Sequence, residues 1–128
     1  MQQALRKRAE RVPLPETPVD QEKDGIWIID MEGKTVYASA RMAEILLTSP
    51  LEMMGRSAFV YVFPEDLDTA KRLFEFKKSG DANSFRFRLC RQDGSPIFVD
   101  VQGTPMHNSI GRFTGIVGTF RTIEKHKP

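Results

Sequence analysis

The sequence predicts an α+β fold in which a five-stranded antiparallel sheet carries short helices over one face. Two strand-like runs lie near the start of the chain, three lie near its end, and helical spacing fills the middle. Glycine turn signals at Gly33 and Asp93-Gly94 join neighbouring runs into hairpins. A sheet with this order encloses a pocket but supplies no catalytic groups of its own.

The first hairpin comprises a strand from Gly25 to Asp30, a turn from Met31 to Lys34, and a strand from Thr35 to Ala38. Asp30 stands at the strand end before a glycine turn, so it is interpreted as a turn-former that accepts hydrogen bonds from nearby backbone.

Helix start signals mark the middle of the chain. Ser39 is placed to cap a helix from Ala40 to about Leu47, and Ser49-Pro50 opens a second, short helix that Gly55 ends. A longer helix is expected from Pro64 to Ser79, because acidic residues begin it and Lys77 and Lys78 lie in its last turn.

The three last strands are expected at Phe85 to Cys90, Ile97 to Val101 and Phe113 to Phe120. A loop with an odd number of residues and a left-handed Gly94 keeps apolar residues of the first two strands opposite one another. This register brings Arg86 and Arg88 beside Asp100 and Gln102 on the outer face, so the arginines are interpreted as cross-strand partners rather than phosphate ligands.

Strand alternation and the helical stripe converge on one set of candidate pocket residues between the sheet and the helices. These bulky side chains are expected to fill the interior rather than leave a cavity, so that any ligand is small and mostly apolar. The set is Phe59, Phe63, Leu73, Phe87, Leu89, Val99, Val101 and Phe120.

Composition excludes several classes of protein. The 128 residues carry a net charge of +2, which supplies no global field for nucleic acid, and the single cysteine allows neither an internal disulfide nor a cysteine-cluster metal site. No apolar run approaches the roughly 20 residues that span a bilayer, so we expect a reduced, cytoplasmic protein without membrane contact.

Three segments divide the chain. Residues 1–23 are a basic stretch followed by a proline-rich linker, residues 24–125 form the domain, and residues 126–128 are a tail toward a missing effector. Leu5 and Val12 recur at helical spacing in the first segment.

Both faces of the first strand are apolar, with Trp27 and Ile29 on one and Ile26 and Ile28 on the other. An apolar outer face requires a cover, either the N-terminal helix or a second copy of the domain. Trp27 and Ile29, together with Leu5 and Val12, are therefore predicted to form a dimerisation and relay surface.

Five short segments occur in one order and spacing along the chain. They are Asp24-Gly25-Ile26 through Asp30 with Gly33, Gly55-Arg56-Ser57, Phe63-Pro64-Glu65-Asp66, Arg91-Gln92-Asp93-Gly94-Ser95, and Gly111-Arg112-Phe113 with Gly115 and Gly118. Through these segments the domain resembles a PAS domain, the common sensory module of bacterial signalling proteins, over roughly four fifths of the chain. The resemblance implies signal input, a homodimer and an effector in the same polypeptide, such as a histidine kinase, cyclase, phosphodiesterase or transcription regulator.

The departures from the family pattern imply that neither flavin nor haem is bound. Flavin photosensors of the family carry an asparagine-cysteine pair where this chain has Ser57-Ala58, and their flavin-reading polar residues correspond to Leu89, Val99 and Phe120. Buried flavin carbonyls would then lack partners, which is costly. Haem-binding relatives place a histidine on the long helix, and residues 64–79 contain none.

We therefore expect a sensor that perceives a small apolar ligand, or else a ligand-free dimerisation and relay module. An enzyme is disfavoured because no nucleophile–base or carboxylate pair is visible in the apolar runs. His107 is interpreted as a solvated loop residue, and Cys90 as facing away from the pocket without a redox partner.

Overall fold

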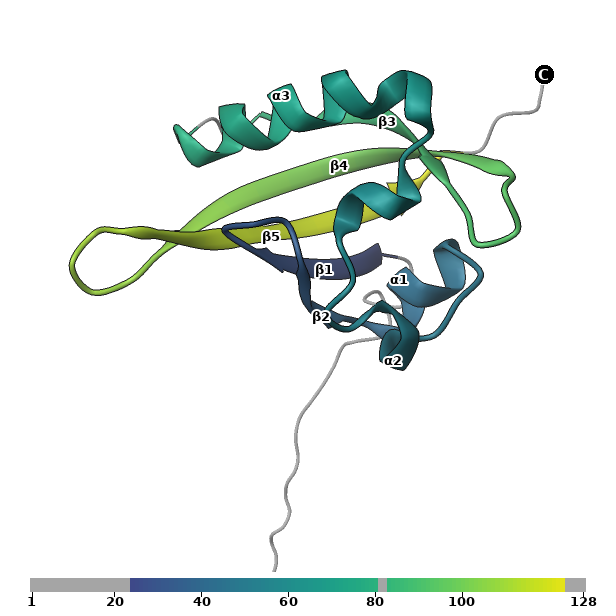
Figure 1. Cartoon of the computed structure of the whole chain (residues 1–128), viewed down its shortest axis with the longest axis horizontal. Coiled ribbons are helices and arrows are strands. Elements are labelled where there is room, and N and C mark those ends of the chain that lie inside the picture. Colours follow the sequence, from purple (N-terminus) through teal and green to yellow (C-terminus); the bar gives the residue numbers. More distant parts are fainter. Residues whose placement is uncertain (1–23, 81–82, 124–128) are drawn as a thin grey trace, which may run out of the picture.

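The computed structural model describes residues 24–80 and 83–123. Five antiparallel strands form one sheet in the order β2-β1-β5-β4-β3, which confirms the predicted fold class (Figure 1). The strands are β1 (Asp24–Asp30), β2 (Thr35–Ala38), β3 (Phe85–Cys90), β4 (Pro96–His107) and β5 (Phe113–Thr122).

The helical elements follow β2 and precede β3. In Figure 1, α3 runs along the β3 and β4 side of the sheet, whereas α1 and α2 lie beside β1 and β2. Short 3₁₀ turns link the two groups. The elements are α1 (Ala40–Ile45), α2 (Pro50–Met53), η3 (Ala58–Tyr61), η4 (Pro64–Asp66) and α3 (Leu67–Lys78).

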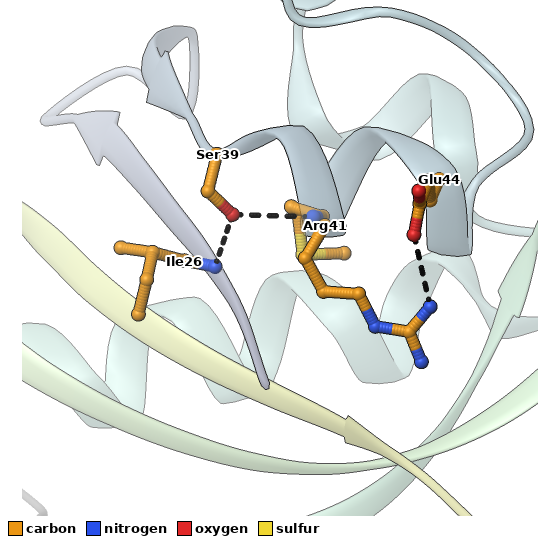
Figure 2. Close-up of polar contacts among 5 residues, drawn as sticks. Ile26, Ser39, Arg41 and Glu44 are labelled. Atoms are coloured by element: carbon orange, nitrogen blue, oxygen red, sulfur yellow. Dashed lines mark hydrogen bonds and ion pairs between the residues drawn. The ribbon is translucent and has the colours of Figure 1, made fainter. Parts of the chain in front are cut away.

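Ser39 joins the first helix to the sheet, as Figure 2 shows. Its hydroxyl oxygen accepts a hydrogen bond from the Met42 backbone N–H at 3.2 Å, which caps α1, and a second from the Ile26 backbone N–H at 3.0 Å. Gly25 allows this close approach, because a Cβ atom there would lie 2.8 Å from the Met42 Cα. The predicted cap is confirmed.

Helix α1 ends two residues before the predicted Leu47, because Leu47 adopts a left-handed conformation with φ of 61°. The N–H of Thr48 donates to the Ala43 carbonyl and that of Leu47 to the Glu44 carbonyl, a Schellman arrangement that normally places glycine at this position. Helical spacing continues through Leu47, so periodicity alone overestimates the helix.

The β3–β4 hairpin has the predicted register, with Phe85 opposite Val101 and Phe87 opposite Val99. A loop from Arg91 to Ser95 joins the strands, and Gly94 is left-handed with φ of 89°. β4 continues to His107, well beyond the expected Val101, since its second half pairs with β5.

Only one of the two arginines of β3 pairs across the strands as predicted. Arg86 Nε lies 3.2 Å from Asp100 Oδ1, on the neighbouring strand. Arg88 lies opposite Phe98 and instead contacts Asp66 at 2.8 Å, because η4 brings its carboxylate to the edge of the sheet.

The prediction that Trp27 and Ile29 face outward is wrong. Trp27 is 4% exposed, its ring lies against Tyr61 and Phe120, and its Nε1 donates to Thr35 Oγ1 at 2.9 Å. Burying the largest apolar side chain of the strand under the helices removes the most surface from water, so the opposite face, with Ile26 and Ile28, is the outer one.

Candidate functional site

A cavity of about 120 Å³ lies between α3 and the inner face of the sheet. Its wall is almost entirely apolar and draws on every strand except β2. The expectation that side chains fill the interior is therefore wrong. The lining residues are Trp27, Ile29, Ala58, Phe59, Val62, Ala70, Leu73, Phe74, Lys77, Phe85, Phe87, Leu89, Val101, Gly103, Ile116, Gly118 and Phe120.

Two glycines form part of the floor of the cavity. Gly103 of β4 and Gly118 of β5 are direct cross-strand partners, and both lie in the cavity wall. A Cβ atom at Gly118 would lie 2.7 Å from the Phe120 ring, and one at Gly103 would lie 3.3 Å from Lys77 Cε. The Phe120 ring and the Lys77 stem therefore pack directly over the two glycines, and a larger residue at either position would have to displace them.

Aromatic rings make up much of the wall, arranged in neighbouring pairs. The ring centroids are 5.4 Å apart for Trp27 and Phe120, and 6.0 Å apart for Phe59 and Phe74. The ring centroids of Phe85 and Phe87 are 6.4 Å apart, and these two rings meet edge to face. These distances are typical of favourable ring pairs, so the rings fix one another in place and the wall is preorganised.

Lys77 is the one charged side chain among the described residues that line the cavity, and it is 3% exposed. Its ammonium donates to the Asn83 backbone carbonyl and lies 5.4 Å from the centre of the Phe85 ring. The alkyl stem packs over Gly103. Lys77 therefore presents methylene groups to the cavity and directs its charge to the start of β3.

Helix α3, which covers the cavity, is attached to the sheet at its N-terminal end. Arg88 of β3 contacts Asp66 at 2.8 Å and Glu65 at 3.3 Å, and its guanidinium lies 4.4 Å from the centre of the Phe63 ring. The hydrogen bond to Asp66 raises the pKa of Arg88 above its ordinary value, because it stabilises the charged guanidinium.

Six of the eight predicted pocket residues lie in this wall, and two do not. Val99 is fully buried within the core, and Phe63 packs under Arg88. Sequence reasoning did not include Trp27, Gly103 or Gly118 in the pocket. Strand alternation does place the two glycines on the pocket face. Gly103 lies two residues after the predicted pocket residue Val101, and Gly118 lies two residues before the predicted pocket residue Phe120.

The remaining candidate residues form no further site in the described part of the chain. His107 ends β4, is exposed and lies against Phe113 at 6.2 Å between ring centres. The Cys90 thiol contacts the Arg91 carbonyl at 3.7 Å. Within residues 24–80 and 83–123, no group of three or more His, Cys, Asp or Glu residues is arranged to hold a metal ion.

The outer face of the sheet carries an apolar row and a charged row. Ile28 stands between its cross-strand partners Tyr37 and Val117, which gives the apolar row. Further along the strands, Arg121 pairs with Asp24 at 3.0 Å and stands opposite Asp100. The predicted surface residues Leu5 and Val12 lie outside the described residues.

None of the described helices is both long enough and apolar enough to cross a membrane.

A family model described as the PAS fold matches residues 15–123. A comparison with curated protein sequences found no significant match.

Solved structures with the same fold share little sequence with this chain. The PAS domain of a Colwellia psychrerythraea protein has a TM-score of 0.73 at 16% identity, with 78% of this chain and 86% of that chain covered. Drosophila melanogaster Cycle PAS-B with bound ethylene glycol has a TM-score of 0.67 at 17% identity, with 77% and 99% covered. A tryptophan-to-alanine variant of Cycle PAS-B, with bound glycerol, gives the same values.

Proposed function

The chain belongs to the PAS family of sensory and regulatory modules, and we propose that it is an input module of a signal-transduction protein that binds a small apolar ligand beneath α3. The observation that carries this proposal is the apolar cavity of about 120 Å³. We propose no catalytic role for the domain itself.

Without a guest, the apolar side chains that line this space lack van der Waals partners on the side that faces it. A ligand that fills the space restores part of the lost van der Waals contact and shifts the population toward the filled state. The cavity therefore couples stability to the concentration of a ligand.

The relatives with bound small molecules support a ligand of few heavy atoms. Cycle PAS-B holds ethylene glycol in one structure and glycerol in another. A cavity of about 120 Å³ fits a molecule of that scale better than it fits an extended cofactor.

We propose further that this site binds neither flavin nor haem. Ala58 contributes a methyl group to the wall in place of the adduct-forming thiol, and Leu89 and Phe120 are apolar where polar partners for a flavin would be needed. Residues 64–79 supply no histidine for haem iron.

The signal is proposed to leave the domain through dimer geometry. The apolar row of Tyr37, Ile28 and Val117 on the outer face provides a surface for a second copy or for the N-terminal segment with Leu5 and Val12. We propose a histidine kinase or a similar effector in the same cytoplasmic polypeptide.

A second candidate is a dimerisation and relay module that binds no ligand, with a cyclase, phosphodiesterase or transcription regulator as effector. The same apolar row favours it, because that surface requires a partner whether or not the cavity is occupied.

Native mass spectrometry, absorption spectra and thermal melts of the full chain separate the two candidates. With a panel of small apolar molecules, we expect saturable one-to-one adducts that raise the melting temperature of a colourless protein. Failure of every molecule to bind favours the relay module, and near-stoichiometric flavin or haem absorbance contradicts the cofactor proposal.

A pair of variants on α3 localises the adduct. Ala70→Phe projects a ring into the cavity and should abolish binding, whereas Thr69→Phe adds the same ring at the neighbouring exposed position and should leave binding unchanged. Equal binding by both variants would place the ligand elsewhere.

A further inference from the structure

The wall of the cavity is rich in aromatic rings. The rings come from β1, η3, α3, β3 and β5, so they approach the space from several directions. Six lining side chains are aromatic: Trp27, Phe59, Phe74, Phe85, Phe87 and Phe120.

The neighbouring ring pairs already adopt the edge-to-face geometry in which an additional aromatic ring would pack. Phe59 meets Phe74 at an interplanar angle of 82°, and Phe85 meets Phe87 at 82°. Edge-to-face neighbours present both ring edges, which are positive, and ring faces, which are negative. An aromatic guest gains from both, whereas an aliphatic guest of the same shape gains only dispersion and burial.

The wall does not suit an anionic guest. The ammonium of Lys77 is engaged by the Asn83 carbonyl and the Phe85 ring, and the alkyl stem of Lys77 faces the space. The other lining side chains are apolar. A carboxylate placed among them would lose its hydration without gaining a partner of comparable strength.

The volume sets the size of the guest. A cavity of about 150 Å³ lined by aliphatic and aromatic side chains is known to hold benzene, and the volume here is about 120 Å³. One six-membered ring with at most a small substituent is of the right scale.

We propose that the ligand of this cavity is an uncharged, single-ring aromatic molecule of about the size of benzene or toluene. The proposal rests on the proposed function, since it requires the cavity to be a ligand site. It adds a chemical class, which the family membership does not supply.

Matched probes test the class on the full chain. Toluene, methylcyclohexane and benzoate share one ring size, but methylcyclohexane lacks π electrons and benzoate carries a charge at neutral pH. Trp27 is the single tryptophan and lies in the cavity wall, so its fluorescence reports binding directly. We expect toluene to bind about tenfold more tightly than methylcyclohexane, and benzoate to give no saturable change.

Two variants distinguish the contribution of ring-to-ring contacts to binding from the contribution of burying apolar surface. Phe87→Leu removes a ring from the wall but keeps it apolar, and should reduce the preference for toluene over methylcyclohexane. Phe76→Leu makes the same change at an exposed position of the same domain and should leave the ratio unaltered.

The outcomes distinguish this proposal from the proposed function. Equal affinity for toluene and methylcyclohexane, or binding of benzoate alone, overturns the aromatic class while the cavity remains a ligand site. Failure of all three probes, with Trp27 fluorescence and the melting temperature unchanged, overturns both. A ratio that Phe87→Leu leaves intact also overturns the aromatic class.

Discussion

Tyr61 places a hydroxyl group in the core without a hydrogen-bond partner in the described part of the chain. The side chain is 2% exposed and its ring packs edge-on against Trp27. Because a buried, unpaired hydroxyl costs about 1–3 kcal/mol, we expect Tyr61→Phe to stabilise the fold by about 1 kcal/mol in chemical denaturation. Tyr37→Phe, at an exposed position, should change nothing. A destabilising Tyr61→Phe would show that a buried water satisfies the hydroxyl.

A substitution at Val99 tests which residues of β4 are predicted to point into the core. It is fully buried, so Val99→Asp would bury a carboxylate without a partner and should cost several kcal/mol, on the order of the whole stability of a small domain. Phe98→Asp, one residue away on the exposed face, should cost much less in the same thermal melts. A Val99→Asp protein as stable as its parent would contradict the assignment of the inner face.

Strand alternation predicts which residues share a face but does not say which face is inside. The alternation correctly places Trp27 and Ile29 on one face, but that face is the inner one and not the outer one. The inner face follows from tertiary contacts, such as Gly25 against Met42, that no local pattern contains. The cavity is equally non-local, because its volume depends on how far α3 stands from Gly103 and Gly118.

Leu47 carries a left-handed backbone at the end of α1, with φ of 61°. A non-glycine residue in this conformation destabilises the folded state by roughly 1–2 kcal/mol. The Leu47 side chain is 48% exposed, so little packing is lost when it is removed. We expect Leu47→Gly to stabilise the fold by about 1 kcal/mol. Leu51→Gly, at an exposed position inside α2, should destabilise it by a similar amount. If urea unfolding showed that both variants are stabilised, or that both are destabilised, this account would be contradicted.

At the scale of elements, the five strands and the longest helix were predictable because their apolar spacing is regular. The length of β4 was not, since Gly103 and Pro105 argue against a strand interior. Pro105 lies beyond Val101, where pairing with β3 ends, so its missing N–H leaves no gap in the ladder with that strand. The contact of Arg88 with Asp66 likewise depends on where η4 returns to the sheet.

The whole molecule is predicted to associate through its outer sheet face. Deleting Met1 to Pro18 should weaken dimerisation or reduce solubility while the fold persists, because it removes the segment proposed to cover the row of Tyr37, Ile28 and Val117. Sedimentation of the full and truncated chains measures this. Two equally monomeric and equally soluble species would show that the outer face needs no partner.

Occupation of the cavity by a small apolar ligand is the central claim, and methyl NMR of the full chain with toluene tests it most directly. We predict intermolecular nuclear Overhauser effects from toluene to the methyl groups of Leu73, Leu89 and Val101, which line the cavity. Effects confined to Ile28 on the outer face or to the exposed Leu51, or no effect at saturating toluene, would contradict it.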